Sequence, residues 1–192
     1  MQLFNGLPIF VVDINDDSVF NNVSIVDRPA IERNFIQLAK QAEIDFKFSV
    51  NDEKRTISGP ALIPDLPIYR RMDDGKEFYI KFTADTIKEY AIKFFKDGRE
   101  GEGNIQHSWG VKGITFFESY LLNKERGIVP VEFKDLPNGT WILSAKVEND
   151  GVWSMIKDGS LQGFSVDIQT TIKESEDVLD SLEDLMEYLN KN

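Results

Sequence analysis

The 192-residue sequence predicts an α+β fold in which helices pack around an open or closed β-barrel. Three observations carry this prediction. Short apolar or alternating segments typical of β-strands recur along the chain, helical patterns are few and fall in the connections, and no internal repeat divides the sequence. A chain of this length buries roughly two thirds or more of its unfolded surface, so one domain can hold a core without disulfides.

The first predicted strands lie in the N-terminal third. Ile9–Val12 is a short apolar strand, and a second strand begins at Val23. Asp27-Arg28-Pro29 turns this strand into a helix that runs to about Ala42. A third strand is expected over Arg55–Ile63.

The middle of the chain predicts a strand followed by a helix. Glu77–Phe82 alternates apolar and polar residues, as a half-buried strand does. Thr83 is expected to cap the following helix, which ends at Asp97-Gly98. Its predicted apolar stripe consists of Ile87, Ala91, Ile92 and Phe95. The polar, glycine-rich segment after the helix is expected to be a loop that carries His107 to the next strand.

Three further strands and a short helix complete the predicted core. Gly113–Leu122 and Thr140–Val147 are the strongest strand patterns, and an Asn138-Gly139 turn precedes the second of them. Between Asn149 and Gly159 the apolar residues have helical spacing; they are Val152, Trp153 and Ile156. Phe164–Ile172 is the last strand.

The C-terminal segment differs in composition from the rest. From Glu174 to Asn192 there are seven acidic residues and one lysine, while apolar residues recur at four-three-four spacing; they are Val178, Leu182, Leu185 and Leu189. This pattern predicts an amphipathic helix. We therefore expect a main domain over residues 1–173 and an acidic helix over 174–192, either packed on that domain or used for association, for instance in a homodimer.

Composition excludes several classes of function. The chain has no cysteine, which excludes disulfides, thiolate zinc sites and cysteine nucleophiles. With 33 acidic against 22 basic residues, no nucleic-acid partner is expected, and the Arg70-Arg71 pair is interpreted as solvated surface. The N-terminus lacks a secretory pattern, and no apolar run is long enough to span a membrane. One histidine with scattered acids has no metal-ligand spacing, so neither a metal nor another cofactor is expected.

The single histidine, His107, is the chain's one possible imidazole base. A serine hydroxyl is a poor nucleophile until a neighbouring base removes its proton. The segment Gly163–Asp167 contains Ser165 and closes the last apolar stretch. Taken alone, however, a loop histidine is usually a surface residue, and a strand serine is rarely catalytic.

An ordered set of short segments extends from about Val23 to about Ile172; it consists of Val26–Glu32, the His107 loop, Phe117–Tyr120, Gly139–Trp141, Val152–Gly159 and Gly163–Asp167. This set resembles the XkdF-like phage prohead protease family, which is related to the herpesvirus assemblins. The resemblance implies a mainly antiparallel, assemblin-like β-barrel and a serine endopeptidase that needs no cofactor. It also implies cleavage of scaffold and capsid proteins, and self-cleavage, inside the assembling prohead in the host cytoplasm.

Position by position, the resemblance makes Ser165 the nucleophile and His107 its general base. Assemblins use a second histidine as the third member of a catalytic triad. This chain has no second histidine, so either an acidic residue completes the triad or Ser165 and His107 act as a dyad. Glu118 is the first candidate, because an acid within an aromatic strand is expected to be half buried and to need a partner. Asp167 is the second, since it shares a sheet face with Ser165. For both acids, the alternative is a solvent-facing carboxylate.

The sequence does not assign the donors for an oxyanion. Assemblins place arginines after the nucleophile for this purpose, and no arginine follows Ser165. Gly163 either lets the backbone near Ser165 approach a substrate or marks a bulge in the strand.

Two other classes of function are open. One is a catalytically inactive structural or scaffold-associated capsid assembly protein with the same fold, for which the acidic tail would serve as an interaction surface. The other is a binding module unrelated to phage that uses the loop from Gly101 to Ser108. Separate substitutions of Ser165 and His107 discriminate among the three.

Overall fold

The computed structural model describes residues 3–15, 18–29, 49–51, 54–71, 75–101, 103–107 and 109–169. The predicted helix running to about Ala42 and the acidic helix over 174–192 lie outside these residues, as do the last three residues of the strand expected to end at Ile172.

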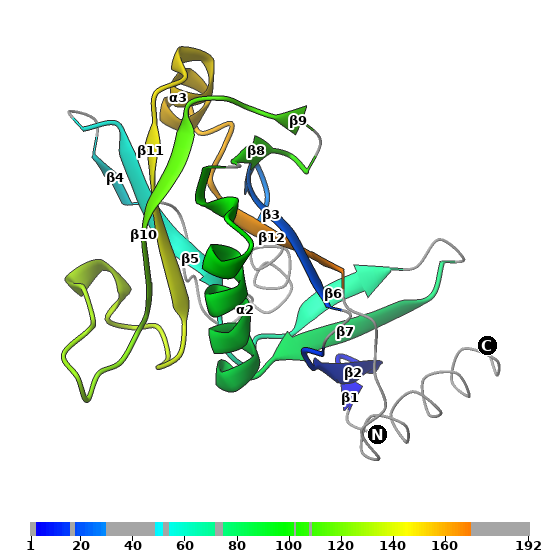
Figure 1. The fold of residues 1–192 in the computed structure, drawn as a ribbon. Coiled ribbons are helices and arrows are strands. Elements are labelled where there is room, and N and C mark those ends of the chain that lie inside the picture. The colour runs from blue at the N-terminus through cyan, green and yellow to red at the C-terminus, as the bar shows by residue number, and fades with distance from the viewer. Residues whose placement is uncertain are drawn as a thin grey trace.

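The described strands form three four-stranded sheets (Figure 1). The first contains, in order, β1 (Leu3–Phe4), β2 (Leu7–Val12), β7 (Glu77–Phe82) and β6 (Ile68–Arg71). The second contains β10 (Ile114–Leu121), β11 (Trp141–Val147), β5 (Thr56–Leu62) and β4 (Ser49–Asn51). The third contains β12 (Gly163–Gln169), β3 (Val19–Val26), β8 (Asn104–Ile105) and β9 (Trp109–Gly110).

Two α-helices accompany these sheets among the described residues, α2 (Ala84–Lys96) and α3 (Asp150–Lys157). Two 3₁₀ turns also occur, η1 (Arg99–Gly101) and η2 (Val131–Phe133). The α+β class is therefore confirmed.

The ladders of the three sheets stay open, and no closed barrel joins them within the described ranges. The pairing is also mixed, because β2 with β7 and β3 with β8 run parallel while the other neighbours run antiparallel. Alternation along one strand reports which face is buried, but it does not report which strand lies beside it. The closed, mainly antiparallel barrel therefore stays a prediction.

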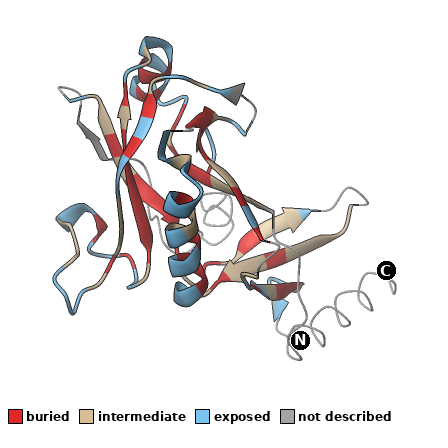
Figure 2. Ribbon diagram, in the orientation of Figure 1, coloured by how far each residue is buried: buried red, intermediate tan, exposed pale blue. Residues whose placement is uncertain are grey.

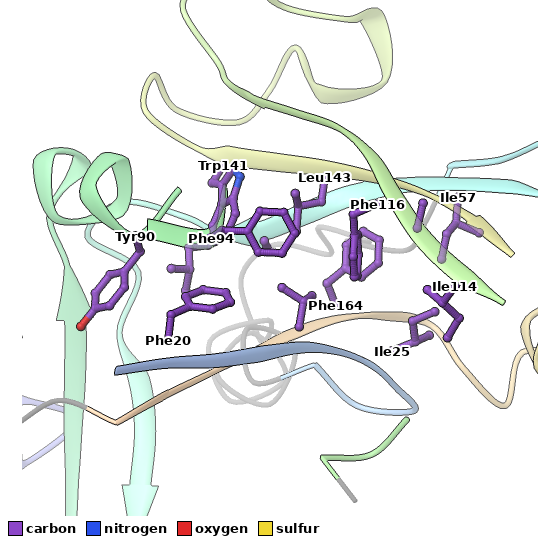
Figure 3. Close-up of a cluster of buried hydrophobic side chains, with 14 of the residues drawn as sticks. Phe20, Ile25, Ile57, Tyr90, Phe94, Ile114, Phe116, Trp141, Leu143 and Phe164 are labelled. Carbon is purple, nitrogen blue, oxygen red and sulfur yellow. The ribbon is translucent and has the colours of Figure 1, made fainter. Parts of the chain in front are cut away.

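One hydrophobic cluster joins the second and third sheets to α2. It is built largely from aromatic and β-branched side chains. The cluster members labelled in Figure 3 are Phe20, Ile25, Ile57, Tyr90, Phe94, Ile114, Phe116, Trp141, Leu143 and Phe164. Figure 2 shows β5 and β11 as largely buried strands within this cluster. The third sheet contributes Phe20, Val23, Ile25 and Phe164 to this cluster.

The boundaries of α2 agree with the prediction, and its buried face agrees in part, because Ile87 is in the core and Ala91 packs against it. Thr83 caps the helix, with its Oγ1 accepting from the Thr86 amide at 3.1 Å. Ile87, Tyr90 and Phe94 are fully buried, whereas the predicted stripe residues Ile92 and Phe95 are exposed. Both sets fit helical spacing, and the aromatic contacts of Phe94 with Phe20, Phe116 and Trp141 select the observed face.

Candidate active site

Strand pairing in the third sheet brings three segments that are distant in sequence into one row. The antiparallel pairing of β12 with β3 sets Ser165 opposite Ser24. β8 lies beside β3 (Figure 1), and the parallel pairing of these strands sets Ser24 opposite Asn104. Directly opposed residues project to the same face of a sheet, so the three polar side chains form a cross-strand row.

His107 lies over this row and contacts two of its members. Its Nε2 is 2.9 Å from the Ser165 Oγ, and its Nδ1 is 3.0 Å from the Ser24 Oγ. The Ser24 hydroxyl in turn donates to Oδ1 of Asn104. Ser165 is 8% exposed and Ser24 is 0% exposed, so the imidazole bridges two buried hydroxyls.

A tight turn between β8 and β9 delivers the imidazole. Gln106 and His107 both have left-handed backbone angles, with φ of 54° and 55°. Such angles are uncommon for residues other than glycine, and consecutive ones reverse the chain within two residues. The Gln106 amide donates to the carbonyl of Ile25 at 3.2 Å, and its side chain bonds to Asp27, which lowers the pKa of that carboxyl. The Asp27 segment and the His107 loop are thereby linked.

Glycine is required just before this turn for a packing reason. A Cβ at Gly103 would lie 2.5 Å from Cγ2 of Ile114, which is a core residue. The absence of a side chain lets β8 approach the core closely enough to pair with β3.

Three electrostatic influences act on His107. Its nitrogens face buried groups, and this partial burial lowers the pKa of the imidazole below 6.5. The nearby charge of Arg70 also lowers the pKa, whereas the charge of Asp167 acts in the opposite direction. The net effect keeps the ring neutral at neutral pH, as a general base must be.

Asp167 lies beside the pair but is not hydrogen-bonded to the imidazole, because both ring nitrogens already have partners. It is two residues beyond Ser165 on β12, and it lines the same hollow as His107. Its influence on the histidine is therefore electrostatic.

Glu118 lies in a different sheet. It is exposed rather than half buried, and it accepts a hydrogen bond at 2.5 Å from Ser144 on the neighbouring strand β11. Burial of Tyr120 is the main cause that raises its pKa to about 12, and the charge of Glu118 is the second cause. The register of β10 shifts between Phe116 and Glu118, which breaks the alternation on which the half-buried expectation depended. The structure does not bring Glu118 to His107.

Arg70 is not the solvated residue that the sequence predicts. Burial lowers the pKa of its guanidinium, and its Nη1 donates to the Tyr69 carbonyl at 3.0 Å. With Ser165 it lines a pocket whose other walls are apolar; they are formed by Val12, Ala61, Leu62, Ile68, Ile80, Phe82, Phe164, Val166 and Ile168. A second, more open hollow lies on the histidine side and is lined by polar groups of β3, β8 and η1. The Ser165–His107 pair thus borders an apolar and a polar hollow.

Gly163 has a structural role that sequence reasoning did not identify. A Cβ at this position would lie 2.6 Å from Cγ of Pro29, so the glycine makes room for that ring. Gly163 pairs regularly with Val26, and the irregularity of β12 falls between Asp167 and Ile168. Of the two alternatives for Gly163, the bulge is therefore wrong.

Sequence reasoning also missed Ser24 and Asn104. Ser24 stands within the apolar run Val23-Ser24-Ile25-Val26, where nothing distinguishes it from an ordinary strand residue. Asn104 ends the glycine-rich loop, and its burial follows only from the pairing of β8 with β3.

The described residues contain neither a cluster of metal-ligating side chains nor a membrane-spanning helix. Three or more metal-ligating side chains do not gather at any point among the residues described here. Within the same part of the chain, no helix has both the length and the apolar character needed to cross a membrane.

Comparison with known proteins relates these residues to a family. The family described as "Putative phage serine protease XkdF" matches residues 35–174, which include His107 and Ser165 but begin after Ser24. A similar protein is the phage-like element PBSX protein XkdF of Bacillus subtilis (strain 168), with 30% identity over 169 residues. The similarity covers 81% of this chain and 54% of that protein, so the chain spans about half the length of the relative. No solved structure matches the chain significantly.

Proposed function

The chain belongs to the XkdF-like family of phage proteases, and from this premise we propose that it is a serine endopeptidase with Ser165 as nucleophile and His107 as general base. The observation that carries the proposal is the 2.9 Å contact between His107 Nε2 and Ser165 Oγ. This distance lies within the range over which a base takes a proton directly from a nucleophile.

The reaction then follows from the positions of these two side chains. The Ser165 Oγ attacks the peptide carbonyl carbon while its proton moves to Nε2 of His107. The imidazolium gives this proton to the leaving amine as the C–N bond breaks, which leaves an acyl group on Ser165. Water, deprotonated by the same nitrogen, attacks the acyl carbon, and the proton returns to the Ser165 oxygen as the carboxylic product departs.

We further propose that the substrates are scaffold and capsid proteins, which the enzyme cleaves in the host cytoplasm inside the assembling prohead. We also propose that the enzyme cleaves itself and that it acts as a homodimer. The support for this setting is the membership in a phage family and the sequence resemblance to prohead proteases. A closed assemblin-like barrel in the complete fold belongs to the same proposal.

The test uses purified protein with its cognate scaffold and capsid proteins, followed by electrophoresis and mass spectrometry of the products. The unsubstituted protein and a Ser154→Ala control, which removes an exposed hydroxyl on α3, should both cleave. Ser165→Ala and His107→Ala should each lose activity by roughly 10⁴-fold or more, because the members of such a site act as a unit. Circular dichroism checks that the fold is kept.

The alternative is a catalytically inactive capsid assembly protein with the same fold. The observation that favours it is the burial of Ser165, since a nucleophile must be reached by its substrate. If the Ser165→Ala/His107→Ala double variant supports head assembly as well as the unsubstituted protein does, the alternative holds and the protease proposal is wrong.

A further inference from the structure

We propose that Ser24 is the third member of this site, as an uncharged positioning residue. Together with Asn104 it holds His107 in the tautomer that carries its proton on Nδ1 and leaves Nε2 free to act as a base. This inference rests on the proposed function of Ser165 and His107. It replaces the expected acidic third member with a neutral hydroxyl.

The argument begins with the single proton of the Ser24 hydroxyl. Three acceptors surround its Oγ: Oδ1 of Asn104 is the nearest, Nδ1 of His107 is at 3.0 Å and Oδ1 of Asn22 is at 3.3 Å. A hydroxyl has one donor and two acceptor sites. If its proton is directed to Asn104, the contact with Nδ1 is a hydrogen bond only if Nδ1 carries the proton.

The opposite arrangement would disable the site. If Ser24 donated to Nδ1, the ring proton would sit on Nε2 and point at Ser165, and the imidazole could not accept the proton of the nucleophile. The carbonyl of Asn104 competes for the Ser24 proton and so selects the productive tautomer. Asn104 is 7% exposed, and a buried side-chain carbonyl is usually satisfied by a protein donor, which here is the Ser24 hydroxyl.

The backbone fixes Ser24 where this selection requires it. Ser24 lies on β3, the strand that pairs with both β12 and β8. Its neighbours across the two ladders are Ser165 and Asn104. The distances among the three side chains are therefore set by strand spacing rather than by flexible loops.

A neutral third member also agrees with the electrostatics of the site. A carboxylate bonded to Nδ1 would strongly favour the imidazolium and raise its pKa. In this structure the charges acting on the ring come from Asp167 and Arg70, which act in opposite directions, and neither is bonded to it.

The decisive experiment uses the fact that His107 is the only histidine. In protein labelled with ¹⁵N-histidine, the two ring nitrogens give one pair of signals, whose shifts distinguish a protonated from an unprotonated nitrogen. At a pH where the ring is neutral, we expect Nδ1 protonated and Nε2 unprotonated. Ser24→Ala should shift the population toward the Nε2-protonated form, while Ser144→Ala, the same change at a buried serine in the second sheet, should not.

Substitutions of Asn104 provide a second test in case Ser24→Ala does not fold. Asn104→Asp keeps an acceptor for the Ser24 proton and should retain the Nδ1-protonated form. Asn104→Ala removes the acceptor and should lose that form. An Nε2-protonated ring in the unsubstituted protein, or a tautomer that changes with none of these substitutions, would overturn the inference.

Kinetics separate this inference from the proposed function. Ser24→Ala should lower kcat by roughly tenfold or more with little change in KM, since it removes one neutral hydrogen bond that orients the base. Ser24→Thr, which restores a hydroxyl, should recover part of the loss. If the unsubstituted protein cleaves nothing, the protease proposal fails, yet the nitrogen shifts still decide whether Ser24 and Asn104 select the tautomer. If Ser24→Ala cleaves at full rate, the positioning role is wrong while the Ser165–His107 mechanism stands.

Discussion

At the scale of single residues, the protonation of His107 controls the proposed reaction. Partial burial and Arg70 lower the pKa of the imidazole below 6.5. Because only the neutral ring accepts a proton, kcat/KM should be at its plateau at neutral pH and should fall as the pH drops through this lowered pKa. The pH profile of kcat/KM measures this value for the free enzyme. An acid limb centred at or above 6.5 would contradict the proposed environment of the ring.

Two substitutions should move the pKa of His107 in opposite directions. Asp167→Asn removes the charge that favours the imidazolium and should lower the pKa further. Arg70→Gln removes a like charge and should raise the pKa toward its ordinary value. The shifts can be measured by NMR titration of the single histidine, with exposed Arg71→Gln as the control for Arg70. A rise of the pKa in Asp167→Asn, or a fall in Arg70→Gln, would show that the charge removed in that variant does not act as described.

At the scale of secondary-structure elements, α2 anchors the core through one face. Phe94 is 0% exposed and packs its ring against Phe20, Phe116 and Trp141, whereas Phe95 is 52% exposed. Phe94→Ala should lower the free energy of unfolding by about 3–5 kcal/mol, because it removes a large buried ring and leaves a cavity. Phe95→Ala is the matched control and should cost less than about 1 kcal/mol. Urea unfolding measures both, and equal losses would mean that the buried face is assigned incorrectly.

The start of β12 should be similarly sensitive. Gly163→Ala forces a Cβ against the ring of Pro29 and should cost about 1–3 kcal/mol of unfolding free energy. Gly101→Ala is the control, because a Cβ there meets nothing within 4 Å. Thermal unfolding of the two variants compares them directly. A Gly163→Ala variant as stable as the control would show that the Pro29 segment moves away without cost.

At the scale of the whole molecule, one cluster of buried side chains draws on all three sheets and both described helices. Shared burial of this kind couples the unfolding of the elements that contribute to it. We therefore expect urea transitions followed by tryptophan fluorescence, with Trp141 and Trp153 in the cluster, to coincide with those followed by far-ultraviolet circular dichroism. Two separated midpoints would show that a sheet unfolds independently.

Periodicity within the sequence was sufficient to predict the longer elements. The strands expected at Ile9–Val12, Glu77–Phe82 and Thr140–Val147 are present, as are α3 and α2, the latter with its predicted cap Thr83. These features depend on residues a few positions apart, which the chain order records directly. The shorter strands β1, β4, β6, β8 and β9 were not predicted, because two to four residues contain too little periodicity.

Only part of the candidate site could be predicted from the sequence. The uniqueness of His107 and the resemblance to a protease family singled out His107 and Ser165, and both can be read along the chain. Three further residues reach the same site from other strands; they are Ser24 on β3, Asn104 on β8 and Arg70 on β6. Glu118 lies in another sheet, because its strand pairs with β11. These placements depend on register between segments tens of residues apart. Because a strand pattern specifies a buried face and not a neighbour, the folded chain alone brings a buried serine, rather than the expected carboxylate, to the second nitrogen of the histidine.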